Sequence, residues 1–150
     1  MIPGITRTKS RGTVRLTGST PDAPLLIDPN YFSDPADMRS MIAAVRLSRK
    51  IGEQAALEGW SAGEHFPGAA VESDEAIARY VERDVSTWFH PVGTCRMGTG
   101  ADAVVTPDLR VRGVANLRVA DASIMPDIVS VNTNAASTMI GWRAGEIVLG

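Results

Sequence analysis

The sequence has little of several features that would narrow its class at once. Its 150 residues include one cysteine, Cys95, so an internal disulfide cannot form, and a reducing compartment is favoured. No apolar run reaches the length of a transmembrane helix, and the N-terminus lacks the apolar core of a signal peptide. We therefore expect no membrane-spanning segment and a cytoplasmic location.

An excess of charge of one sign is lacking too. Fifteen basic and seventeen acidic residues give a formal net charge of −2, and no basic block or arginine stripe stands out. A nucleic-acid partner thus has no electrostatic support. The apolar content of 44% is typical of a globular protein with a buried core. Since the length suits one domain and no flexible linker is evident, we expect residues 1–150 to form a single unit.

The first third of the chain carries signals for two extended segments and a helix. Apolar and polar residues alternate over 12–16, which predicts a strand, and the segment 24–32 predicts an edge strand or extended loop that Pro29 interrupts. Asp34 and Pro35 then predict the start of a helix. Its apolar face is formed by residues at helical spacing, and we expect its methionines in the core: Met38, Met41, Ile42 and Val45.

The remaining elements are shorter, apart from the last. The glycine- and proline-rich segment 59–68 predicts a loop, a second helix is expected from Ser73, and a last helix from about 134 to 149. Strand-like segments are expected at 86–90, 104–105, 109–111 and 116–119. Together these elements predict an α+β fold, an antiparallel sheet with helices.

Two histidines are the candidates for proton transfer near neutral pH. His65 lies in the glycine- and proline-rich loop and is expected at the surface. His90 ends an aromatic segment and is followed by Pro91 and a glycine-rich turn, which suits a close backbone approach to a bound molecule. From spacing alone, a buried structural histidine remains a better interpretation of His90 than a functional one.

Other chemistries find weaker support. A hydrolase would need Cys95 and His90 to face each other, with a third group orienting the imidazole. A zinc site would need more cysteine and histidine ligands than the three in the chain, so no metal site is expected. The segment 98–103 matches G-x-G-x-x-G/A, but it has no preceding apolar strand and no following helix, and so predicts a turn instead of a dinucleotide site.

Several motifs in order resemble one family. The run 90–98, His-Pro-Val-Gly-Thr-Cys-Arg-Met-Gly, is similar to the signature around the active-site histidine of the glucose–methanol–choline oxidoreductases. The runs 116–126 and 131–135, followed by the last helix, resemble later blocks of the same family. The segments 11–16 and 26–31 resemble the opening of its C-terminal, substrate-binding region, so the resemblance covers nearly the whole chain.

The resemblance implies an FAD-dependent oxidation of a CH–OH group in a small-molecule alcohol. By this resemblance, His90 is the base that takes the hydroxyl proton, while hydride passes to the flavin. Asn132 matches a position whose side chain pairs with the catalytic histidine, and would hydrogen-bond the developing alkoxide. The residues implied to contact the cofactor are Asp121, Ala122, Asn132, Thr133 and Asn134.

One part of the family pattern is lacking. Its enzymes begin with a nucleotide-binding βαβ unit of the Rossmann type, and residues 1–89 contain nothing that resembles it. We therefore expect the chain to be the C-terminal quarter to third of a larger enzyme, in which about 116–150 would pack on the FAD domain. By itself such a fragment would expose apolar surface and self-associate. The alternative is a non-catalytic module that binds a separate FAD-binding chain. The sequence leaves open which alcohol is used, and whether oxygen or another acceptor reoxidises the flavin.

Overall fold

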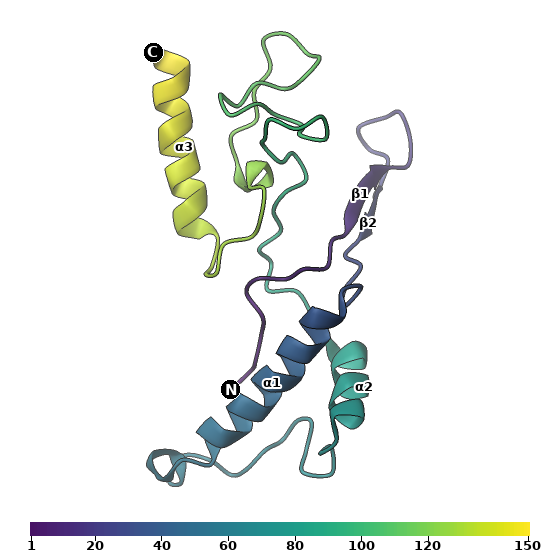
Figure 1. Ribbon diagram of the computed structural model, residues 1–150, viewed down its shortest axis with the longest axis vertical. Helices are drawn as coiled ribbons and strands as arrows, with labels where there is room; N and C mark the ends of the chain where they lie inside the picture. The colour runs from purple at the N-terminus through teal and green to yellow at the C-terminus, as the bar shows by residue number, and fades with distance from the viewer. The chain divides into compact units, whose positions relative to one another are not determined.

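A computed structural model describes all residues from 1 to 150. It contains three α-helices, two short 3₁₀ helices and one two-stranded antiparallel sheet, which confirms the α+β class (Figure 1). The residue contacts divide the chain into two compact units, although the sequence shows no linker. Unit 1 comprises Met1–Gly12 and Pro29–Thr87, and unit 2 comprises Thr13–Asp28 and Trp88–Gly150.

The sheet is a hairpin of strands β1 (Thr13–Leu16) and β2 (Leu25–Asp28). Thr13 pairs with Asp28 and Leu16 with Leu25, so both expected extended segments are confirmed, and β2 ends directly before Pro29, which has no amide hydrogen to donate. The hairpin is narrower than the expected sheet because no third strand joins it. Every one of its eight residues is exposed.

Unit 1 is built around two helices that begin where the sequence predicts. Helix α1 (Pro35–Gly52) is capped by Asp34, whose carboxylate accepts a 2.8 Å hydrogen bond from the Ala36 amide. Helix α2 (Asp74–Asp84) is capped in the same way by Ser73. Each cap satisfies an amide that the first helical turn cannot, which contributes about 1 kcal/mol.

The core of unit 1 lies where α1 and α2 contact each other. Val45, Ile77 and Val81 are buried, and the predicted apolar face of α1 packs against them, including Met38 and Met41. The predicted loop at 59–68 is confirmed, and the 3₁₀ helix η1 (Ala55–Leu57) precedes it. An ion pair of 2.8 Å joins α1 to this loop, between Arg49 and Glu64.

A buried carboxylate fixes the N-terminal segment of unit 1. The oxygens of Asp37, in the first turn of α1, accept 2.8 Å hydrogen bonds from the backbone amides of Lys9 and Ser10. The residue is only 3% exposed. Burial by itself raises the pKa of Asp37, but hydrogen bonds from the Ser10 side chain and the two amides outweigh it, so the pKa lies below its ordinary value.

In unit 2, isolated β-bridges stand where the sequence predicts short strands. Val105 bridges both Met97 and Val111, and Arg110 bridges Arg118. The pairings are one residue long because turns at 99–102 and 113–116 interrupt them, so the strands predicted at 104–105, 109–111 and 116–119 are reduced to single bridged positions. The prediction of a strand at 86–90 was wrong, since Phe89 has a φ of 61°, a left-handed geometry that ends any extended run.

The core of unit 2 lies between these bridged turns, the 3₁₀ helix η2 (Ala122–Ile124) and helix α3 (Asn134–Leu149). Its buried members are Val105, Leu109, Ile124, Met125, Ile140 and Ala144. Other side chains of α3 are exposed, among them the apolar Met139, Trp142, Val148 and Leu149 and the ion-paired Arg143 and Glu146. None of the three helices combines the length and apolar character needed to cross a membrane.

Candidate functional site

His90 lies in unit 2, directly after the left-handed residue Phe89 and before Pro91. Its ring is half-buried, and Nδ1 lies 3.1 Å from the hydroxyl Oγ1 of Thr133. These two residues are 43 positions apart in the chain. His90 is thus fixed from two sides, by its own constrained backbone and by the start of α3.

The turn after His90 is tied to η2 through the backbone. The Cys95 amide donates to the Ser123 carbonyl at 3.0 Å, and the Met97 amide donates to the Ile124 carbonyl at 2.8 Å. Gly93 adopts a φ of 86°, which an L side chain rarely takes, and a Cβ there would lie 3.4 Å from the Met125 carbonyl. The glycine that the sequence places here therefore allows the turn to approach η2 closely.

Asp121 and Ala122 form the start of η2. The Asp121 carboxylate caps this short helix by accepting a 2.7 Å hydrogen bond from the Ser123 amide. Hydrogen bonds from the Ser123 side chain and from its amide lower the pKa of Asp121. Asp121 is therefore a charged, exposed carboxylate with a local structural role, and the predicted cofactor contacts of Asp121 and Ala122 remain predictions.

The start of α3 presents hydrogen-bond donors beside His90. Thr133, the N-cap residue, is 9% exposed, and its carbonyl accepts the first helical hydrogen bond, from the Ser137 amide. The first-turn amides of residues 134, 135 and 136 have no acceptor within the chain. Unsatisfied amides at a helix N-terminus favour an electron-rich or anionic group.

The structure brings one predicted residue, His90, to a run of three others. Asn132, Thr133 and Asn134 are consecutive, and Thr133 joins them to His90. The side chains of Asn132 and Asn134 are exposed, so they are accessible to a bound molecule. The direct contact between Thr133 and His90 was not predicted, because nothing in the sequence relates a hydroxyl to an imidazole 43 residues away.

The geometry does not support a Cys95–His90 nucleophile pair, a functional His65, a metal site or a dinucleotide site. Cys95 makes no hydrogen bond to His90, whose ring nitrogen faces Thr133 instead. His65 is exposed and packs its ring against Phe66 at 4.3 Å between centroids. No three acidic, cysteine or histidine side chains gather where they could hold a metal ion. The residues 98–103 form a turn with no helix after it, as predicted.

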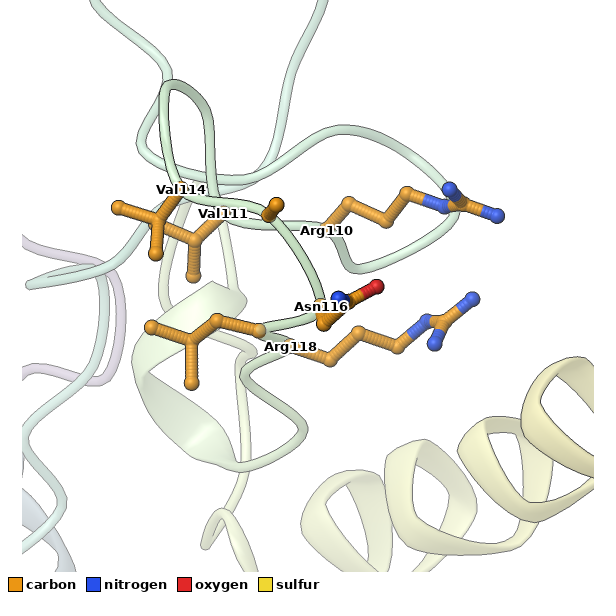
Figure 2. Close-up of a pocket in the computed structure, with 7 residues that line it drawn as sticks. Arg110, Val111, Val114, Asn116 and Arg118 are labelled. Atoms are coloured by element: carbon orange, nitrogen blue, oxygen red, sulfur yellow. The ribbon is translucent and has the colours of Figure 1, made fainter.

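A separate cavity of about 280 Å³ lies on the bridged turns of unit 2 (Figure 2). Its walls include Arg110 and Arg118, whose side chains extend in the same direction from bridged backbone positions. The Arg110 guanidinium is paired with Asp108 at 2.7 Å. None of the predicted site residues lines this cavity, so it is distinct from the surroundings of His90.

Comparison with known proteins identifies the family to which this fold and these motifs belong. Residues 8–141 match the C-terminal domain of the GMC oxidoreductases. The chain therefore belongs to the glucose–methanol–choline oxidoreductase family, as the sequence motifs indicate. The matched range runs through both compact units, so both are parts of this one family domain.

Individual relatives and a solved structure support this family assignment. The chain is 43% identical to choline oxidase of Arthrobacter globiformis over 99% of its length, and 46% identical to the alcohol dehydrogenase [acceptor] of Pseudomonas putida over 94%. Among solved structures, pyridoxine 4-oxidase from Mesorbium loti superposes on 95% of the chain with a TM-score of 0.91 and 39% identity. The chain spans only 26–28% of the length of these three proteins.

Proposed function

We propose that this chain forms the catalytic, substrate-binding part of an FAD-dependent oxidoreductase that converts a CH–OH group to a carbonyl. The observation that carries the proposal is the contact between His90 and Thr133, the residue that follows the exposed Asn132 in the chain. Membership of an oxidoreductase family supports the same reaction class. The relatives named choline oxidase and alcohol dehydrogenase support a small alcohol as the substrate class.

His90 would serve as the base. Because Nδ1 is occupied by Thr133, Nε2 is the ring nitrogen left for the substrate. A neutral imidazole accepts the hydroxyl proton at this atom, and a positioned base of this kind typically contributes 10²–10⁴ in rate. The left-handed turn at Phe89 and the ring of Pro91 restrict how far the imidazole can move away from that position.

Asn132 would stabilise the charge that develops as the proton leaves. Its exposed side-chain amide can donate a hydrogen bond to the substrate oxygen. Such a donor is most effective when the neighbouring backbone is already fixed, since no reorganisation is then needed during the reaction. The backbone next to Asn132 is fixed by the burial of Thr133 and by the first hydrogen bond of α3.

The residues beside His90 fit one end of the flavin. The unsatisfied amides at the start of α3 would face the electron-rich edge of the ring system, and Asp121, Ala122, Asn132, Thr133 and Asn134 would line it. When bound, the flavin supplies the acceptor for the hydride of the carbinol carbon. Residues 1–150 offer no strand, glycine turn and helix in succession for the pyrophosphate, so that end of the cofactor would need another segment or chain.

A second candidate is a non-catalytic module that only binds a flavin-binding partner. The exposed apolar side chains on the outer face of α3, Trp142 and Leu149 among them, favour a surface that another chain or domain covers. The two candidates differ in one respect, because only the first requires His90 for chemistry.

The test is flavin reduction in a flavin-loaded protein that contains residues 1–150. His90→Ala should slow reduction by roughly 10²–10⁴ in anaerobic stopped-flow measurements, the loss expected for a positioned base. Raising the pH should restore part of the rate, because more of the alcohol then reaches the site already ionised. His65→Ala is the matched control and should leave the rate unchanged, since His65 is exposed in unit 1. Equal rates for His90→Ala and the parent would refute the proposal.

A further inference from the structure

We propose that Thr133 is a positioning residue for His90, and that it selects the tautomer in which Nδ1 carries the proton. In this arrangement Nδ1–H donates to Oγ1 of Thr133, and Nε2 retains its lone pair. The proposal rests on the function proposed above, because that function requires an unprotonated Nε2 to act as the base. The geometric basis is the 3.1 Å separation between Oγ1 and Nδ1.

The position of the Thr133 hydroxyl is determined independently of His90. Thr133 is one of two buried polar residues in the chain, together with Asp37. Its carbonyl accepts hydrogen bonds from the Ser137 amide at 2.9 Å and from the Ser137 hydroxyl at 2.8 Å. Since Thr133 has a β-branched side chain with few rotamers, a fixed backbone restricts the direction of Oγ1 to few alternatives.

The hydroxyl of Thr133 does not make the capping hydrogen bond that an N-cap threonine usually makes. An N-cap threonine normally accepts a hydrogen bond from an amide of the first helical turn. Thr133 makes no such bond, and its backbone is in the helical region, with a φ of −75° and a ψ of −8°. The hydroxyl contacts the imidazole of His90 instead, so its acceptor lone pairs are available to Nδ1–H.

The direction of the hydrogen bond follows from the proton that His90 must accept. If Oγ1–H donated to Nδ1, Nε2 would carry the ring proton and could not act as a base. If Nδ1–H donates to Oγ1, Nε2 is free, and the bond persists after the ring becomes a cation because both ring nitrogens are then donors. No carboxylate hydrogen-bonds the ring, so a neutral hydroxyl orients this histidine without a compensating negative charge.

The tautomer can be measured directly by ¹⁵N NMR, without catalysis. The chain has two histidines, so His65 serves as an internal reference for an imidazole without this contact. At about pH 9, where an ordinary imidazole is neutral, His90 should show a protonated Nδ1 and an unprotonated Nε2. Thr133→Val, which removes the hydroxyl but keeps the shape, should abolish this preference, and Thr133→Ser should keep it. The signals of His65 should not move.

Thr138→Val is the matched control. Thr138 lies on the exposed side of α3, and its hydroxyl donates to the Asn134 carbonyl at 3.0 Å, within the same helix. The substitution removes the same atoms from the same helix without touching His90, so the tautomer should be unchanged. A protonated Nε2 on His90 in the parent, or an unchanged tautomer in a folded Thr133→Val, would overturn the proposal. If Thr133→Val does not fold, the parent and Thr133→Ser spectra still decide between the two tautomers.

A kinetic measurement distinguishes failure of this inference from failure of the proposed function. In the flavin-loaded protein, Thr133→Val should slow flavin reduction by roughly tenfold, the lower end of what orienting partners of metal-ligating histidines contribute. The same substitution should have no further effect in a His90→Ala background. If His90→Ala itself left the rate unchanged, the proposed function would fail while the tautomer result could still stand. If His90→Ala slowed the reaction but Thr133→Val did not, only the positioning role would fail.

Discussion

The backbone amide of Cys95 donates a 3.0 Å hydrogen bond to the carbonyl of Ser123, and this bond ties the turn that follows His90 to η2. The connection uses main-chain atoms alone. The thiol of Cys95 makes no hydrogen bond to His90 or to any other described residue. The geometry of the turn is therefore independent of the cysteine side chain, although the cysteine is the chain's only thiol.

Cys95→Ser should for this reason leave flavin reduction within about twofold of the parent rate. Alkylation of the thiol should slow the reaction only if the added group blocks access to the site sterically, and serine, which cannot be alkylated, would then be resistant. The measurement is the rate of flavin reduction in parent and variant, each with and without an alkylating reagent. A large loss of rate in Cys95→Ser would show that the thiol, and not only the backbone of this turn, is needed for flavin reduction.

Asn132→Ala should lower the rate of flavin reduction by roughly 10²–10³, the usual loss of one donor to a developing oxyanion. Flavin content should change little, because the variant removes a side-chain donor and leaves the start of α3 intact. Asn134→Ala is the natural comparison, since Asn134 is the other exposed asparagine of this segment. If Asn134→Ala shows the loss and Asn132→Ala does not, the roles of the two residues must be exchanged.

Residues 1–150 alone should not retain FAD. The first-turn amides of α3 can contact one end of the cofactor, but the segment 98–103 is a turn that cannot cradle a pyrophosphate. Gel filtration of the chain mixed with FAD, monitored at the flavin absorbance band, should separate protein from flavin. Stoichiometric flavin in the protein peak would show a nucleotide site that neither the sequence nor the fold reveals.

Asp37→Asn should destabilise unit 1 by roughly 2–3 kcal/mol at neutral pH, since two buried hydrogen bonds to a charged acceptor are lost or weakened. The pKa of Asp37 is lowered in the folded state, so its carboxylate stabilises the fold at pH values above the ordinary 3.8. That contribution disappears as the pH falls through the folded-state pKa. The difference in unfolding free energy between parent and variant should thus shrink between pH 6 and pH 3 in denaturant titrations.

The control for Asp37 is Asp22→Asn, the same chemical change at an exposed side chain with no hydrogen bond in the structure. It should alter the unfolding free energy by less than about 0.5 kcal/mol at either pH. A pH-independent difference for Asp37→Asn would mean that the carboxylate has the same pKa in the folded and unfolded states.

The helices could be predicted from the sequence because their signals are local. Asp34 and Ser73 each hydrogen-bond an amide two or three residues away, so a capping pattern read along the chain is sufficient. The strand predicted at 86–90 failed since the left-handed geometry of Phe89 depends on its surroundings in the fold, and aromatic residues normally favour strands.

The candidate site residues could be proposed from the sequence, but the contact between two of them could not. His90 and Asn132 stand out through motifs of a known family, whereas the contact of His90 with Thr133 joins residues 43 positions apart. Asp37 was missed for the same reason. An aspartate in the first turn of a helix is ordinary in sequence, and only the fold shows that it binds Lys9 and Ser10.

The β1–β2 hairpin has a consequence for handling the protein. A ribbon of two strands has two outer edges, and neither edge of this one is paired with another strand. Exposed Val14, Leu16, Leu26 and Ile27 give these edges β-branched and apolar side chains, and Arg15 and Asp28 are their only charged residues. Such edges are templates for strand addition. When residues 1–150 are produced alone, assembly should therefore begin at this ribbon, and a lysine in place of Val14 should act as a gatekeeper that keeps the protein dispersed.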